Sequence, residues 1–519
     1  MNANAAHHVH DEIAVLDFGS QYTQLIARRL REVGVFSQIY PYHRYQDVLG
    51  RPEVKGIVLS GGPSSVSDAG APDVGDDVLT AGVPILGICY GMQLLAKKLG
   101  GRIEASDKRE YGPATIHVED EAGFFHGTPA SQGVWMSHGD RVGALPTGFR
   151  VIASSESIPY AAAADPDRKF WCVQFHPEVV HTQHGMTLLK NFVRDLCGVS
   201  EEWSASMFVD EAISEIREQV GDRKVLCGVS GGVDSTVVAA ILDKAIGEQL
   251  HTVFVDNGLL RLGEASQVEH SLNGFLHRPI LRVDARNQFL NRLEGVAEPE
   301  RKRKIIGNTF IEVFKSATRD LGDFDFLAQG TLYPDRIESV SVNGPSHVIK
   351  THHNVGGLPA ELGFELIEPL KDLFKDEVRR VGRSLDIPDA LLMRHPFPGP
   401  GLGVRILGAV DRDKVRLLQE ADHIYIEELH ASGQYTKIWQ ACAVLLPVQT
   451  VGVMGDQRTY EYAVALRAVT SMDGMTADWA RIPNDVLARI SNRIINEVPG
   501  INRVVYDISS KPPSTIEWE

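Results

Sequence analysis

One run of seven residues has the types and order of an anion-binding loop: Ser230, Gly231, Gly232, Val233, Asp234, Ser235 and Thr236. The apolar run Val225–Val229 precedes it and the run Val237–Leu242 follows, so we expect a strand, a turn and a helix N-terminus. Such a turn presents backbone N–H groups and a positive helix dipole to an anion, and its glycines allow a close approach. An ordinary glycine turn is the alternative, but seven suitable residues behind a strand favour the anion site.

A second group of residues has the types needed for nucleophilic catalysis. The stretch Gly87–Gly91 places Cys89 between a predicted strand and the helical run Met92–Ala96, in the cysteine form of the nucleophile elbow G-x-S-x-G. The helix N-terminus favours the thiolate. Far downstream, His176 and Glu178 stand at i and i+2, which on a strand-like segment would put them on one face. Glu178 would then orient His176 while His176 serves Cys89, and a buried structural cysteine is the simpler alternative.

A third piece, Ser60–Pro63, follows a predicted strand and offers backbone N–H groups to an oxyanion. In this order the three pieces resemble the class I glutamine amidotransferases over almost the whole first segment. The resemblance implies that Cys89 attacks the glutamine side-chain amide, and that the N–H groups near Gly62 and Tyr90 stabilise the tetrahedral intermediate. It also implies that the downstream histidine moves the proton while the acid two residues later holds its ring.

One further stretch of this segment, Trp135–Asp140, resembles a part of the same family near the glutamine pocket. It contains a rival histidine, His138, to which we assign no orienting acid. His176 is therefore the expected base.

The seven-residue loop lacks the G-x-x-x-x-G-K-[ST] spacing and the lysine of a Walker A loop. It resembles the pyrophosphate loop of ATP pyrophosphatases, which cut ATP between the α- and β-phosphates to adenylate a substrate. The resemblance implies that the loop holds ATP phosphates with Mg²⁺, for which Asp234 and Asp335 are the candidate ligands. Asp335 closes the stretch Gln329–Asp335 and has the alternative role of capping a turn. Asp256, at the end of an apolar strand, is as readily a turn residue as a nucleotide contact.

Basic residues are concentrated at Arg301–Lys304, which would ordinarily be a solvated helix face. In a net acidic chain with anionic substrates, a phosphate role gains weight. The run also matches a family segment that helps to bind the substrate nucleotide, which makes Arg303 a candidate. His352–Pro359 is another matching stretch, and its adjacent histidines would point to opposite faces of a strand.

The C-terminal segment indicates the acceptor. His395–Leu402 and Lys511–Glu519 closely resemble the GMP synthetase family, as does the order of the three segments over essentially the full length. The resemblance places Lys511, Ile516 and Glu517 at the xanthylate (XMP) site, although Ser514 stands where alanine is common. Lysine can pair with a phosphate and a carboxylate can accept from a purine N–H. The expected reaction makes GMP from XMP, with glutamine as nitrogen donor and MgATP as activator, and the tail would also mediate homodimerisation.

The elements that position these residues indicate a multidomain α/β chain. Short apolar runs alternate with helical patterns from Ile13 to about Val199, which predicts a parallel sheet, and a second α/β series begins near Val225. We expect a loose tail at 1–11, an amidotransferase domain at 12–200, a Rossmann-like ATP pyrophosphatase domain at 201–395 and a small α+β domain at 396–519. The proline- and glycine-rich stretch Pro396–Gly401 marks the last boundary.

Composition is consistent with this organisation. The chain has 519 residues, 43% of them hydrophobic, with a formal charge of −16 that argues against general nucleic-acid binding. Its five cysteines are widely spaced without C-x-x-C pairs, and no secretory signal or membrane-length apolar run is visible, so we expect a cytoplasmic protein without a prosthetic group. Two other functions compete with the expected reaction. They are a ligase that acts on deamido-NAD or tRNA, against which the tail argues, and a non-catalytic nucleotide or glutamine sensor.

Overall fold

The computed structural model describes residues 10–200, 203–319, 322–340, 364–454, 457–471 and 476–519. Contacts divide the chain into two compact units, with the first running to Glu211 and the second beginning at Ala212, apart from Ile337–Val340, which groups with the first. The expected boundaries near residues 200 and 395 stay predictions. No helix in the described parts of the chain has the length and apolarity to cross a bilayer.

The first unit is built on one nine-stranded sheet, in the order β2-β1-β3-β4-β9-β8-β7-β5-β6. Its parallel half comprises β1 (Glu12–Asp17), β2 (Phe36–Pro41), β3 (Val54–Leu59), β4 (Ile85–Ile88) and β9 (Phe170–Val173). The other strands are β5 (Arg102–Val118), β6 (Ser131–Ala144), β7 (Arg150–Ser155) and β8 (Ala162–Asp165). They pair antiparallel, so the expectation of a wholly parallel sheet is wrong for this half.

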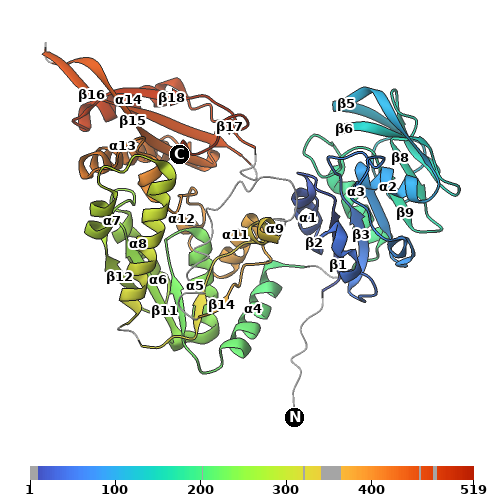
Figure 1. Cartoon of the computed structure of the whole chain (residues 1–519), viewed down its shortest axis with the longest axis horizontal. Helices are drawn as coiled ribbons and strands as arrows, with labels where there is room; N and C mark the ends of the chain where they lie inside the picture. Colours follow the sequence, from blue (N-terminus) through green and yellow to red (C-terminus); the bar gives the residue numbers. More distant parts are fainter. Residues whose placement is uncertain (1–9, 201–202, 320–321, 341–363, 455–456, 472–475) are drawn as a thin grey trace. The chain divides into compact units, whose positions relative to one another are not determined.

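Helices α1 (Thr23–Glu32), α2 (Tyr90–Lys98) and α3 (Gly185–Asn191) accompany this sheet (Figure 1). The strands expected before Ser60 and before Cys89 are confirmed as β3 and β4, and every residue of β4 is buried. Strands covered on both faces carry unbroken apolar runs, which explains why the parallel half was readable from sequence.

The second unit contains a five-stranded parallel sheet in the order β12-β11-β10-β13-β14. The strands are β10 (Val225–Gly228), β11 (Leu250–Asp256), β12 (Leu281–Asp284), β13 (Phe326–Ala328) and β14 (Glu365–Ile367). Its helices are α5 (Val233–Ile246), α6 (Glu264–Phe275), α7 (Arg286–Leu293), α8 (Pro299–Arg319), α11 (Lys375–Ser384) and α12 (Asp389–Leu392). Helices α4 (Ala205–Val220) and α9 (Tyr333–Val340) each have residues in both units. This arrangement confirms the second α/β series.

The same unit ends in the expected α+β part. Its strands are β15 (Gln440–Met454), β16 (Gln457–Thr470), β17 (Asp478–Trp479) and β18 (Ile501–Asp507), and its helices are α13 (Arg412–Ala431) and α14 (Asn484–Glu497). Figure 1 shows α13 between this sheet and the helices α7 and α8. One apolar core extends from Val253 and Phe314 through α13 to Ile501, so both sheets of this unit share a single packed interior.

Candidate active sites

The nucleophile elbow is present at the junction of β4 and α2. Cys89 has φ 52° and ψ −101°, a conformation that non-glycine residues rarely adopt. The flanking glycines are required by close approach: a Cβ on Gly87 would lie 2.7 Å from the Gly91 carbonyl, and a Cβ on Gly91 would lie 2.3 Å from the Leu59 oxygen. The sharp turn therefore depends on the absence of side chains on both sides of Cys89.

His176 and Glu178 form a buried pair, with His176 Nδ1 2.7 Å from Glu178 Oε1. They lie in a turn just after β9, so the expected strand-like segment is wrong although the two side chains do meet. Burial alone would lower the pKa of His176, but the Glu178 carboxylate and a hydrogen bond with Cys89 together raise it well above its ordinary value. A raised pKa favours the protonated imidazole, which is the form that can give a proton to a leaving group.

Two further groups contact the sulfur. Gln174 Nε2 lies 3.7 Å and the Ser137 carbonyl oxygen 3.6 Å from Cys89 Sγ. Ser137 belongs to the stretch Trp135–Asp140, so that stretch does lie beside the nucleophile. Gln174 was not assigned a role from sequence, because only the fold shows that its amide reaches the sulfur.

Gly62 and Tyr90 are neighbours in the first unit. A Cβ on Gly62 would meet the Tyr90 ring at 3.2 Å and the Phe18 carbonyl at 3.0 Å. Among the described residues, the N–H groups of Gly62 and Tyr90 have no hydrogen-bond acceptor. Donors left without an acceptor beside a nucleophile are what an oxyanion site requires.

The pyrophosphate-type loop has the predicted strand–turn–helix setting, between β10 and α5. Gly231 has φ +75°, and Gly232 is the extended residue before the helix. Ser230 Oγ accepts from the Gly232 N–H at 3.3 Å. Thr236 is buried and its hydroxyl donates to the Gly232 carbonyl at 2.8 Å, so its side chain supports the helix start rather than an open surface.

Two basic residues fix this loop, and neither was identified from sequence. Lys375 Nζ lies 2.5 and 2.6 Å from the two carboxylate oxygens of Asp234. Arg394 donates to the Gly231 carbonyl at 2.7 Å. Their partners are distant in the chain, and single basic residues carry no sequence pattern of their own.

The acidic candidates differ in their surroundings. Asp256 is buried and accepts from Arg282 Nη2 at 2.9 Å, so its carboxylate is already paired. Asp335 accepts the Leu332 N–H at 3.1 Å, which is a turn-capping contact. In the described ranges, no three His, Cys, Asp or Glu side chains are grouped so as to hold a metal ion. Asp234, partly exposed at the loop, fits the one or two carboxylates that Mg²⁺ takes beside substrate phosphates.

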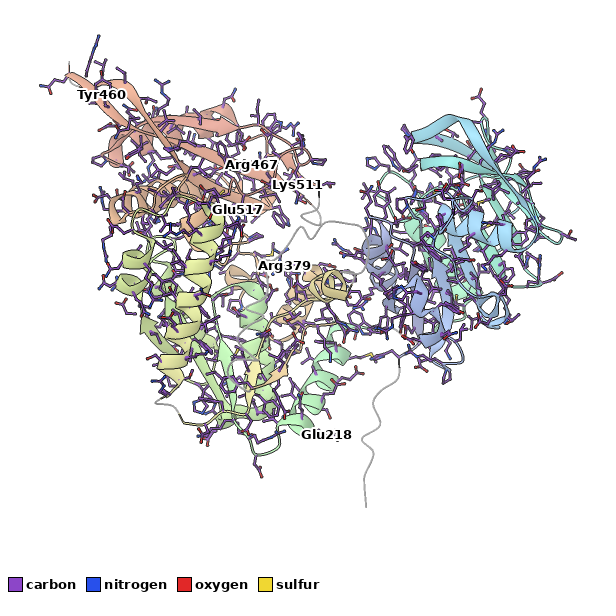
Figure 2. The ribbon with its side chains drawn as sticks, viewed as in Figure 1. Glu218, Arg379, Tyr460, Arg467, Lys511 and Glu517 are labelled. Atoms are coloured by element: carbon purple, nitrogen blue, oxygen red, sulfur yellow. The ribbon has the colours of Figure 1, made fainter. Side chains whose placement is uncertain are left out.

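The C-terminal residues Thr515–Glu519 are tied to buried cations. Figure 2 labels two of the residues concerned, Arg467 and Glu517. Glu517 accepts from Arg405, and Glu519 from Lys302 at 2.5 Å; both cationic side chains are fully buried. Ile516 is buried against Val469 and Ala477.

The other candidates for the nucleotide site have separate partners. Arg303 forms an ion pair with Glu300 at 2.5 Å. The C-terminal tail pairs through Glu519 with Lys302, the residue before Arg303. The backbone of Lys511 pairs with that of Ala477. The stretch His352–Pro359 lies outside the described residues.

The fold and the Cys89 site define the N-terminal half as a class I glutamine amidotransferase, and the family model of that name matches residues 14–196. Models described as NAD synthase and GMP synthase C terminal domain match residues 206–260 and 427–518. A GMP synthase [glutamine-hydrolyzing] of Chlorobaculum tepidum is 57% identical over 98% of this chain and 99% of its own length. One of Maridesulfovibrio salexigens is 54% identical over 98% and 100%. The chain belongs to the glutamine-hydrolysing GMP synthase family.

Proposed function

We propose that this chain hydrolyses glutamine to ammonia, adenylates XMP with MgATP and aminates the adenylate to GMP, with release of AMP and pyrophosphate. The observation that carries this proposal is full-length similarity to GMP synthases at 54–57% identity, together with an intact Cys89 site and an intact loop at Ser230–Thr236. A non-catalytic sensor would not need both.

In the first reaction, the Cys89 sulfur attacks the carboxamide carbon of glutamine. The carbonyl oxygen becomes an oxyanion that accepts from the N–H groups of Gly62 and Tyr90. His176 gives its proton to the departing nitrogen, which leaves as ammonia, and a thioester remains on Cys89. His176 then takes a proton from water, which attacks the thioester and releases glutamate. Glu178 holds the ring and favours its charged form.

In the second reaction, the C2 oxygen of XMP attacks the α-phosphorus of ATP and pyrophosphate leaves. Adenylation is needed because an amide-like oxygen is a poor leaving group and AMP is a good one; ammonia then displaces AMP at C2. The loop N–H groups and the α5 N-terminus bind the phosphates. Lys375 stands at the same helix terminus, where it orients Asp234. Mg²⁺, when bound with ATP, would screen the phosphate charge beside Asp234, with Asp335 as the second candidate ligand.

The XMP site is proposed at Arg303, Lys511, Ile516 and Glu517. The buried pairing of Glu517 with Arg405 supports a fixed carboxylate that still has lone pairs for a purine N–H. A homodimer is proposed through the hairpin β15–β16, which exposes Val448, Val451, Val453 and Tyr460. Figure 2 labels Tyr460 on this hairpin. A cytoplasmic location is part of the proposal, since all five cysteines are free thiols.

The deciding experiment is Cys89→Ala assayed with each nitrogen source. We expect GMP formation from glutamine to be lost and formation from added ammonium to be retained. Loss of both activities in a folded variant would contradict the division of the two reactions. A panel of XMP, deamido-NAD and tRNA, with pyrophosphate release as the readout, separates the proposed acceptor from the other ligases, and no release with any acceptor would favour a sensor.

A further inference from the structure

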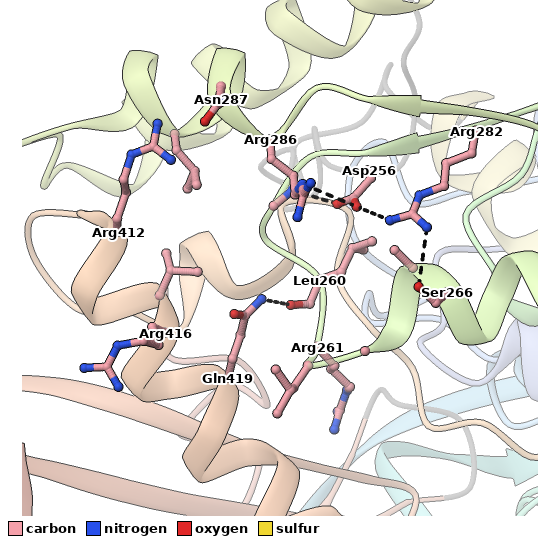
Figure 3. A pocket seen from close by; sticks show the side chains of 16 residues that line it. Asp256, Leu260, Arg261, Ser266, Arg282, Arg286, Asn287, Arg412, Arg416 and Gln419 are labelled. Carbon is pink, nitrogen blue, oxygen red and sulfur yellow. Dashed lines mark hydrogen bonds and ion pairs between the residues drawn. The ribbon is translucent and has the colours of Figure 1, made fainter. Parts of the chain in front are cut away.

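A cavity of about 550 Å³ lies in the second unit, between the loop after β11 and the helices α6, α7 and α13 (Figure 3). None of the residues Ser230–Thr236 lines it, and neither do the candidate XMP residues. The reaction described above leaves this cavity without a role. Its volume is in the range that small-molecule sites occupy.

The lining is strongly basic. Its sixteen residues include one acid, Asp256, and five arginines: Arg261, Arg282, Arg286, Arg412 and Arg416. The formal charge of the lining residues is therefore five minus one, or +4, in a chain whose net charge is −16, although four of these arginines also pair with carboxylates just outside the lining. A local concentration of one sign in a concave site focuses the potential on an anionic ligand.

Three of the arginines are held in place by acids. Asp256 lies between Arg282, at 2.9 Å, and Arg286, at 3.9 Å (Figure 3). Arg282 also pairs with Glu269 at 3.0 Å, and Arg286 with Asp284 at 2.5 Å. Arg261 pairs with Asp422 at 2.7 Å. Asp422 is not part of the lining. A guanidinium has five N–H donors, so a paired arginine retains donors for a ligand and is fixed in position by its partner.

The other two arginines, on α13, are only weakly engaged. Arg412 donates to the Asn291 amide oxygen at 2.7 Å and has no carboxylate partner among the described residues. Arg416 pairs with Glu420 one turn along the same helix, an exposed contact of small energy. Both can turn toward an anion at little cost.

The N-termini of three helices add to the positive potential in this cavity. Gly263 and Ser266 at the start of α6, Arg286 and Asn287 at the start of α7, and Arg412 at the start of α13 all line the cavity. Each of these helices presents its positive end at this place, although first-turn N–H groups of all three already have acceptors: Glu264 N–H bonds to Arg261, Arg286 N–H to Asp284 and Lys414 N–H to Asp411. Three helix N-termini and five arginines are more positive groups than a single phosphate would contact.

We propose that this cavity binds a polyphosphate group, at a site distinct from the ATP loop at Ser230–Thr236. Leu260, Leu262, Leu290 and Val415 also line it, which leaves apolar surface for the base of a nucleoside polyphosphate. The same group could come from inorganic polyphosphate, so the two sources are tested separately.

The test is hydrogen–deuterium exchange of the full chain with GTP or with inorganic tripolyphosphate as probe. We expect either probe to slow amide exchange over Gly258–Ser266 and Arg412–Gln419, and the probe that binds more tightly identifies the source. In Arg412→Ala/Arg416→Ala this slowing should vanish and the affinity at the site should fall at least about tenfold, while any slowing over Ser230–Thr236 persists.

A matched control removes the same charge elsewhere. Arg102 and Arg150 are exposed in the first unit and form only surface pairs, so Arg102→Ala/Arg150→Ala should behave as the unaltered protein. Slowing confined to Ser230–Thr236, slowing by neither probe, or equal loss in the control variant would each overturn the proposal.

Discussion

Arg405 and Glu517 form a two-point ion pair: Arg405 Nε donates to Oε2 at 3.0 Å and Nη2 donates to Oε1 at 2.8 Å. The Arg405 side chain is fully buried, so Glu517 is the acid that compensates its charge. Lys302 and Arg467, also buried, bind the same C-terminal segment. The tail is thus part of the packed interior of the second unit.

Glu517→Gln should therefore destabilise the second unit by roughly 3–5 kcal/mol, because removing one partner of a buried pair leaves an uncompensated charge. Chemical denaturation followed by intrinsic fluorescence measures the change. Glu497→Gln breaks a surface pair with Arg493, which solvent screens, so it should change the free energy of unfolding far less. Equal effects of the two variants would contradict the structural role of Glu517.

Cys89 should be the one cysteine that iodoacetamide modifies rapidly at neutral pH. Burial raises the pKa of Cys172, Cys227 and Cys442 to about 12 and also raises the pKa of Cys197. Cys89 alone has an imidazole beside its sulfur. Peptide mass spectrometry of the briefly treated protein locates the adduct, and prior alkylation should abolish glutamine-dependent but not ammonium-dependent synthesis. A first adduct on any other cysteine would refute the assignment.

Asp234→Asn should lower GMP formation at least about a hundredfold with either nitrogen source, because the loop loses the carboxylate that Lys375 orients. Glutamine hydrolysis and Cys89 alkylation report on the other site and should persist. Asp243→Asn, the same change on the same helix, should leave both reactions intact. If Asp234→Asn synthesised normally from ammonium, Asp234 would have no part in ATP activation.

The lowered pKa of His395 predicts that the folded protein loses stability in acid. Burial lowers the pKa of His395 from 6.5 to about 4, and nearby Arg261 and His430 act in the same direction. Its Nδ1 accepts the Ala441 N–H at 3.2 Å, a bond that protonation would break. The unfolded chain therefore binds more protons between these pH values, so the free energy of unfolding falls as pH drops from about 6.5 to about 4.

Urea unfolding at a series of pH values tests this dependence. His395→Gln should flatten it, whatever its effect on stability at neutral pH. His126→Gln, on the exposed surface of the first unit, should keep the dependence. An unchanged slope in His395→Gln would show that other groups cause the acid sensitivity.

The proposed homodimer predicts that Val453→Glu/Tyr460→Glu is monomeric. Val453 is 73% exposed and Tyr460 62% exposed on the β15–β16 hairpin, and a charge on such a surface opposes its burial in an interface. Sedimentation velocity gives the mass directly. An unaltered protein that is itself monomeric at micromolar concentration would remove this part of the proposal.

Local patterns explain what the sequence could predict. The strand–elbow–helix around Cys89 and the strand–loop–helix at Ser230–Thr236 are each contained in about twenty residues, so short-range signals specify them. His176 and Glu178 were expected to pair, which is confirmed, but through a strand, which is wrong. A two-residue spacing is compatible with several backbone conformations, and only the packing after β9 selects the turn.

Long-range partners explain what the sequence could not. Lys375 meets Asp234 across 141 positions and Arg394 meets Gly231 across 163. No periodicity or composition links residues at such separations. Gln174 stands only two residues before His176, yet its contact with Cys89 depends on how β4 and β9 align. The antiparallel half of the first sheet was missed although β6 shows alternating burial, the signal of a strand with one covered face.

The backbone conformation at Cys89 also creates a trade-off between the stability of the domain and its reactivity. A residue other than glycine held at φ 52° and ψ −101° costs of order 1–3 kcal/mol. Glycine at position 89 would remove this backbone strain and give a more stable domain that has no nucleophile. Selection for thermal stability alone would therefore favour glycine at position 89 and an inactive protein. Only selection for glutamine hydrolysis would maintain a side chain at this turn.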